Sequence, residues 1–148
     1  MAWIDSLFQR ETAPVLELSM ALGHQKQLAI MNNIANIDNP HYRRQATPDR
    51  EFTKMLDRAI QQRAKSHINE FVPKSTSNIK FGNRSVYPSR INIMYGKDQG
   101  TERHDRNNVT IESEMANLAK NTLDINLLQR LYKKKFTMLR AASRNTVT

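Results

Sequence analysis

The sequence predicts a mainly α-helical fold, in which an N-terminal and a C-terminal helix form an antiparallel, coiled-coil-like pair with a short helix and a loop-rich insertion with little β structure between them. Apolar residues recur at helical spacing near the start and again near the end of the chain, and glycine, proline, serine and asparagine gather in the middle. We therefore expect one discontinuous helical domain. Its parts are an N-terminal helical segment over 1–65, an insertion over 66–108 and a C-terminal helix over 109–148 that packs with the N-terminal helix.

The first helix is expected between Val15 and Ile37, a stretch without proline. Pro14 suits a first helical turn, and the helix must end near Asp38 because Pro40 disfavours helical geometry in the residue before it. The apolar face that we expect at the helix interface is formed by Val15, Leu18, Leu22 and Ala29.

A short second helix and one strand are expected next. Thr47 and Pro48 suit the N-cap and first residue of a helix whose apolar face runs from Phe52 to Ile60. The insertion that follows holds three of the four glycines and shows little periodicity. Within it, apolar and other residues alternate over 91–95, which predicts a half-buried strand or one arm of a hairpin.

The C-terminal segment carries the strongest pattern, a heptad seam whose members are separated alternately by four and three positions. The seam is formed by Ile111, Met115, Leu118, Thr122, Ile125, Gln129, Tyr132, Phe136 and Leu139. Four further leucines, Leu123, Leu127, Leu128 and Leu131, widen this stripe beyond what one partner helix covers. We expect the apolar members of the seam to form the helix interface and the whole helix to contact several neighbours.

Composition limits the classes of function. Hydrophobic residues make up 39% of the 148-residue chain, which predicts a thin core, and 23 basic against 14 acidic residues give a net charge of +9. With no cysteine, disulfides, thiolate-bound metals and a thiol nucleophile are excluded. Neither a cleaved signal peptide nor a membrane span is expected, since the longest apolar run is Leu28 to Met31.

An enzyme is not expected. The motifs of nucleophilic serine hydrolases, phosphate-binding loops, dinucleotide-binding folds and helical zinc proteases do not occur in the sequence. The four histidines lie on different predicted elements without ligand spacing, so we expect neither a metal nor a cofactor. Glu112 and Glu114 point apart on a helix and are explained as charges at its N-terminal end.

A basic helical nucleic-acid-binding protein is the alternative. Three lysines at 133–135 lie between Tyr132 and Phe136, and aromatics interleaved with positive charge suit nucleic-acid binding. Because both aromatics occupy seam positions and the lysines do not, a solvated turn above a packed interface is the preferred interpretation.

An asparagine-rich stretch near the end of the first helix is the most unusual feature. Residues 32–36 read Asn-Asn-Ile-Ala-Asn and residues 39–42 read Asn-Pro-His-Tyr. Asparagine is a poor helix former, so its amides are expected to bond to backbone or neighbouring groups. This spacing, after an N-terminal helix, resembles the N-terminal signature of the bacterial flagellar axial proteins of the rod and hook. The matching residues, which we take as an assembly motif, are Asn32, Asn33, Ile34, Ala35, Asn36, Pro40 and Tyr42.

The C-terminal half strengthens the resemblance. Residues 105–109 and 114–116, Asn121 and residues 134–136 are similar to the C-terminal region of proximal-rod members of that family, and the chain length agrees with them. His41 and Arg106 stand where the family usually carries glycine.

The resemblance implies a structural subunit of the proximal rod of the flagellar basal body, exported unfolded through the flagellar type III apparatus and assembled in the periplasm. Such a subunit polymerises through its terminal helices into the drive-shaft between the inner-membrane ring with its export gate and the distal rod and hook. The implied partners are copies of itself, a FlgC-like rod protein, a FliE-like export-gate adaptor and the inner-membrane ring. Nucleic acid is not among them.

Overall fold

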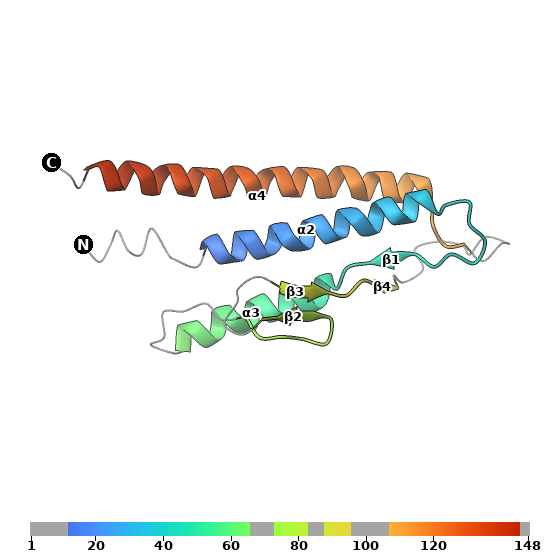
Figure 1. Cartoon of the computed structure of the whole chain (residues 1–148), viewed down its shortest axis with the longest axis horizontal. Coiled ribbons are helices and arrows are strands. Elements are labelled where there is room, and N and C mark those ends of the chain that lie inside the picture. Colours follow the sequence, from blue (N-terminus) through green and yellow to red (C-terminus); the bar gives the residue numbers. More distant parts are fainter. Residues whose placement is uncertain (1–11, 66–72, 83–87, 96–106, 146–148) are drawn as a thin grey trace.

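The computed structural model describes residues 12–65, 73–82, 88–95 and 107–145. Two long helices, α2 (Thr12–Ala35) and α4 (Ile111–Asn145), run side by side along the molecule (Figure 1). Their directions are opposite, because the end of α2 contacts the start of α4 and its beginning contacts the later part of α4. The predicted mainly α-helical fold with an antiparallel pair of terminal helices is confirmed.

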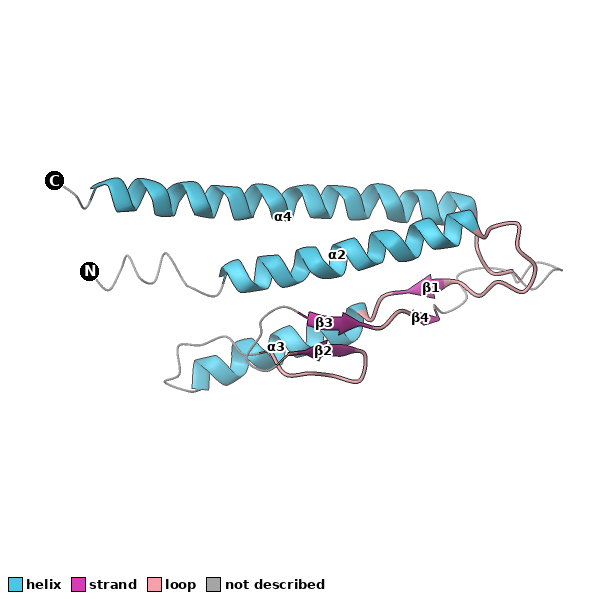
Figure 2. Cartoon of the chain, in the orientation of Figure 1, coloured by secondary structure: helices cyan, strands magenta, loops and turns pink. Residues whose placement is uncertain are grey.

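The shorter elements lie on the side of α2 that faces away from α4 (Figure 2). Helix α3 (Asp49–Lys65) starts one residue after Pro48, and the Thr47 hydroxyl lies 2.6 Å from the Asp49 carboxylate. Strand β2 (Ile79–Phe81) pairs antiparallel with β3 (Pro88–Ile91), with a register irregularity between Lys80 and Phe81. Strand β1 (Gln45–Ala46) pairs antiparallel with β4 (Met94–Tyr95).

The segment 91–95, predicted as a half-buried strand or one arm of a hairpin, is divided between two antiparallel strand pairs. Ile91 ends β3, and the Asn92 amide then donates to the Asn78 carbonyl at 2.8 Å. The chain leaves β2 there and reaches β1 two residues later. Alternation along a sequence cannot reveal this exchange of partners, since pairing is decided by distant strands.

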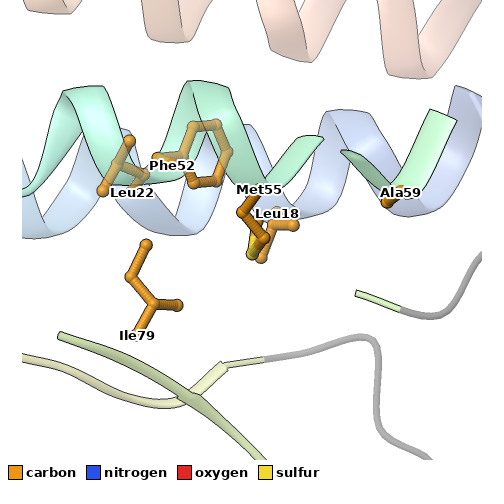
Figure 3. Close-up of a cluster of buried hydrophobic side chains, with 6 residues drawn as sticks. All are labelled: Leu18, Leu22, Phe52, Met55, Ala59 and Ile79. Carbon is orange, nitrogen blue, oxygen red and sulfur yellow. The ribbon is translucent and has the colours of Figure 1, made fainter. Parts of the chain in front are cut away.

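The main apolar cluster lies between α2, α3 and β2 (Figure 3). Its buried members are Leu18, Leu22, Phe52, Met55, Ala59 and Ile79, and Val15 packs against them. Val15, Leu18 and Leu22 were predicted for the interface of the terminal helices but belong to this cluster instead. The physical reason is that apolar residues are distributed around much of α2, so its sequence pattern does not show which face meets α4 and which meets α3 and β2.

Another face of α2 packs closely against α4 at Gly23. A Cβ atom at this position would lie 2.9 Å from Cγ1 of Ile125, so a side chain there would force the helices apart. The Asn121 side-chain amide donates to the Gly23 carbonyl at 3.0 Å. Glycine is therefore required here for close helix packing.

The α4 residues that face α2 form a 4-3 seam that is rotated from the predicted one. Its buried or partly buried members are Glu114, Leu118, Asn121, Ile125, Leu128 and Tyr132. Leu118, Ile125 and Tyr132 were predicted for the interface, whereas Ile111, Met115, Phe136 and Leu139 remain 41–56% exposed within the chain. An apolar pattern misses the true seam because polar Glu114 and Asn121 occupy two of its positions.

Candidate functional site

The asparagine-rich stretch forms the junction between the end of α2 and the start of α4. The Asn107 side-chain amide points at the carbonyls of Asn36, Ile37 and Asn39, at 3.1, 2.8 and 3.0 Å. These carbonyls follow the last helical residue, Ala35, where a helix leaves acceptors without intrahelical donors. Asn107, which is fully buried, thus closes the end of α2 from a position about 70 residues further along the chain.

Asn33 is the centre of the junction and is fully buried. Its Nδ2 donates to the Gln45 carbonyl at 2.9 Å and to Oε2 of Glu114 at 3.1 Å. Its Oδ1 accepts from the Gln45 amide at 2.8 Å and from the Tyr42 hydroxyl at 3.1 Å. One amide group therefore joins α2, the turn after it, β1 and α4.

A buried ion pair completes the junction. Nε of Arg44 lies 2.5 Å from Oε1 of Glu114, and the two side chains are 12% and 1% exposed. The Arg44 backbone amide also donates to Oδ1 of Asn108 at 2.8 Å. The interpretation of Glu114 as a helix-end charge is incomplete, because its carboxylate is buried between Asn33 and Arg44 while Glu112 is exposed.

The electrostatics of the junction affect Tyr42. Burial, together with the negative charge of Glu114, raises the pKa of the Tyr42 phenol above its ordinary value of 10.0. The phenol therefore stays neutral and remains a donor to Asn33 over the physiological range.

The turn at 36–41 brings Tyr42 into place. His41 has a φ of 61°, in the left-handed region that glycine adopts most easily. The turn that the family usually builds with glycine is kept here with an exposed histidine. Arg106, the other departure from the family pattern, lies outside the described residues.

The members of the predicted assembly motif have different environments. Asn33 is buried, Ile34, Asn36 and Tyr42 are half-buried, and Asn32, Ala35 and Pro40 are exposed. Asn36 bonds locally, with its Nδ2 donating to the Asn32 carbonyl at 2.8 Å. Sequence reasoning missed Arg44 and Gln45 as members of the junction, and it had no signal for them, since their partners lie 12 to 70 residues away.

The predicted interface residue Ala29 is buried beside β1. It lines a pocket of about 230 Å³ together with Lys26, Arg44, Gln45 and Asp49, among others. Lys26 and Asp49, which both line this pocket, form an ion pair at 2.6 Å, and both side chains are partly exposed. The pocket shares Arg44 and Gln45 with the junction, and Oε1 of Gln45 is buried there without a hydrogen-bond partner among the described residues.

The far end of the helix pair is held differently. The Tyr132 hydroxyl donates to Oε1 of Glu17 at 2.6 Å, and this hydrogen bond raises the pKa of Tyr132 above its ordinary value. Burial lowers the pKa of the neighbouring Lys135. The rings of Tyr132 and Phe136 lie 6.2 Å apart. The aromatics that suggested nucleic-acid binding thus have contacts within the chain, while Phe136 still exposes 56% of its surface.

Metal-binding clusters and membrane-spanning helices are both absent from the described residues. Among residues 12–65, 73–82, 88–95 and 107–145, no group of three or more histidine, cysteine, aspartate or glutamate side chains is arranged to hold a metal ion. No helix in the same ranges has the length and apolar character that crossing a membrane requires.

Comparison with known proteins gives two related sequences, although no protein-family model matches the chain. The flagellar basal body rod protein FlgB of Borrelia hermsii is 30% identical over 128 residues, which cover 79% of this chain and 89% of that protein. FlgB of Bacillus subtilis is 28% identical over 125 residues, which cover 84% of this chain and 87% of that protein. With an identity of this size over most of both chains, the protein belongs to the FlgB family of flagellar basal body rod proteins.

Proposed function

We propose that this chain is a structural, non-enzymatic subunit of the proximal rod of the bacterial flagellar basal body. It polymerises through its terminal helices into the shaft that connects the inner-membrane ring and export gate to the distal rod and hook. The names of the two FlgB relatives support the rod assignment. The chain reaches the periplasm through the flagellar export apparatus and assembles there.

The observation that carries this proposal is the apolar surface that α4 leaves uncovered. Eight large hydrophobic side chains of this one helix are 41–69% exposed. They are Ile111, Met115, Leu123, Leu127, Leu131, Phe136, Met138 and Leu139. Proteins that act as monomers rarely expose such a density of apolar residues along one element. The surface suits a subunit whose burial is completed by its neighbours in an assembly.

The predicted interface residues that do not face α2 are the expected rod contacts. Ile111, Met115, Phe136 and Leu139 belong to one heptad register, and all four are exposed in the single chain. They are available to further copies of the chain and to FlgC-like and FliE-like partners. The inner-membrane ring is a further partner in this proposal.

The experiment is deletion of the gene in the bacterium that encodes it, followed by rescue with variants. Loss of motility and of the rod, with recovery of the tagged wild-type chain in isolated basal bodies, is the expected result. Phe136→Asp should be exported but fail to assemble, because a carboxylate would have to be desolvated at each copy of the interface. Thr137→Asp, one residue away and outside this register, is the matched control. Rods of normal length and composition in the deletion strain would refute the proposal.

A further inference from the structure

A second apolar line on α4 faces away from the rest of the molecule. We call it the outward seam, and it consists of Leu127, Leu131, Lys134 and Met138, separated by four, three and four residues. Leu127 lies two residues after buried Ile125, or about 200° around the helix. Leu127, Leu131 and Met138 are 57, 45 and 47% exposed, and Lys134 is exposed as well. All other described elements lie on the α2 side of α4 (Figure 1).

We propose that the outward seam binds the outward seam of a second copy of this chain in antiparallel orientation. The pair places Leu127 of one copy against Leu131 of the other, and Lys134 of one copy against Asp124 of the other. Both contacts occur twice, because a two-fold axis relates the copies. The inference goes beyond the proposed function, since it concerns the free chain rather than the rod.

The arithmetic of the helix supports this register. In an antiparallel pair, the residue numbers of facing positions add up to a constant. Placing residue 127 opposite residue 131 therefore also places 134 opposite 124 and 138 opposite 120. Asp124 is exposed and lies three residues before Leu127, on the same side of α4. The lysine and the aspartate are therefore both next to the leucines that would meet. Lys120 opposite Met138 lets an aliphatic lysine stem cover the methionine.

Charge along α4 selects the antiparallel direction. Residues 130–145 contain six basic and no acidic side chains, whereas the exposed acidic residues of α4, Glu112 and Asp124, both precede Arg130. A parallel pair in register would place Lys134 against Lys134 and one basic half against the other, which is destabilising. The antiparallel pair brings each basic half beside the half that carries the acidic residues.

The geometry separates this contact from rod assembly. A two-fold contact uses the same patch on both copies and closes, so it cannot propagate into a filament. The pair would cover the outward seam of the free chain, and rod growth must use other faces or open the pair. A tight pair would therefore have to open before Leu127, Leu131 and Met138 could be covered by neighbours in the rod, and this one consequence rests on the proposed function.

Charge exchange on the purified full-length chain tests the pair. Sedimentation velocity over roughly 1–100 μM should show a concentration-dependent dimer for the wild type. Lys134→Asp and Asp124→Lys should each weaken dimerisation by about tenfold or more, because each makes two pairs of like charges, and the double variant should restore it to within about threefold. Lys133→Asp and Asp57→Lys carry the same charge changes outside the seam and should leave the dimer unchanged. Far-ultraviolet circular dichroism establishes that every variant is folded.

Three outcomes would contradict the proposed dimer. The wild-type chain stays monomeric, or the double variant dimerises as weakly as the single variants. In the third, Lys133→Asp weakens dimerisation as much as Lys134→Asp, which would indicate a general charge effect such as binding to an anionic surface. Mixing wild type with Lys134→Asp distinguishes a parallel pair, because only that arrangement makes the mixture tighter than either protein alone. Failure of the pair leaves the proposed function intact, since the deletion and rescue of the gene do not depend on the dimer.

Discussion

The two ends of the α2–α4 pair are built in opposite ways. At the junction end, where residues 30–45 meet residues 107–121, Asn33, Asn107 and Glu114 are all fully buried and bonded to groups far away in the sequence. At the open end, where residues 12–22 meet residues 128–145, the Tyr132–Glu17 hydrogen bond connects the helices, and Phe136, Met138 and Leu139 are exposed.

The difference teaches that one helix pair can serve both folding and assembly. The buried side chains of Asn33, Asn107 and Glu114 are satisfied by partners from distant parts of this same chain, so the junction end contributes to how the chain folds by itself. Exposed apolar side chains gain nothing until another surface covers them, so Phe136, Met138 and Leu139 at the open end are left for contacts with other molecules, as are Ile111 and Met115 beside the junction. Breaking the junction should therefore cost far more monomer stability than changes at the open end.

Arg44→Ala should have the largest effect. It leaves the Glu114 carboxylate buried without its counter-charge, at a cost of about 3–5 kcal/mol in the free energy of unfolding. Urea denaturation of the purified chain measures this. Arg43→Ala is the matched control, because Arg43 is exposed and its guanidinium lies 5.3 Å from the centre of the Tyr95 ring, a cation–π contact worth about 0.5–1 kcal/mol. Equal effects of the two substitutions would contradict the importance of the junction.

Asn33→Leu should have the next largest effect. It should lower the free energy of unfolding by about 2–3 kcal/mol, because the Tyr42 hydroxyl and the Gln45 backbone amide lose their buried acceptor.

Asn36→Leu should lower the free energy of unfolding by about 1 kcal/mol, since the Asn36 side-chain amide is half-buried and bonds one turn back along the chain. The same denaturation experiment ranks the two. A larger loss for Asn36 would mean that the asparagine-rich stretch acts through its helix end rather than through Asn33.

His41→Gly should stabilise the chain by about 0.5–1 kcal/mol. The residue holds a left-handed conformation that costs any side chain with a Cβ atom, and its own side chain is exposed. Pro40→Gly, next in sequence and without such strain, should not stabilise. A rise in the thermal midpoint for His41→Gly alone supports this reading, and a fall would show that the histidine side chain contributes a contact.

The smallest effect concerns pH at the open end. The hydrogen bond to Glu17 raises the pKa of Tyr132 on folding. The contribution of Tyr132 to the free energy of unfolding is therefore fully present below the pKa of the unfolded chain, near 10, and is lost as the pH rises through the pKa of the folded chain. Stability of the wild-type chain should therefore fall more steeply above pH 10 than that of Tyr132→Phe. Parallel curves for the two proteins would show that the hydrogen bond is not formed in solution.

Local patterns predicted much of this architecture. The proline positions and apolar spacing located all three described helices, and Leu118, Ile125 and Tyr132 were found at the helix contact. Met115 and Phe136 do not face α2, because Glu114 and Asn121 take contact positions that an apolar pattern assigns to solvent. The predicted interface role of Met115 and Phe136 stays a prediction about contacts between chains. Ile125 packs against Gly23 within the chain, so Ile125→Asp would disturb the helix pair itself and is not a specific test of rod assembly.

The junction could be predicted only in part. The density of asparagine near the end of the first helix indicated that side-chain amides there bond to backbone, and those of Asn33 and Asn36 do so. The sequence held no information on which groups they meet, because Asn33 and Glu114 are 81 residues apart and the pairing depends on the completed turn and strand between them. Long-range polar contacts follow from the fold and do not show as periodicity.

Amide hydrogen exchange along α4 of the dilute purified chain tests the contrast between the two ends most directly. The amides of residues 114–128 should be protected at least about 100-fold more than those of residues 136–145, because only the former half is fixed by buried contacts to the rest of the chain. Uniform protection along the whole helix, or stronger protection of residues 136–145, would contradict the division into a self-sufficient junction end and an open end.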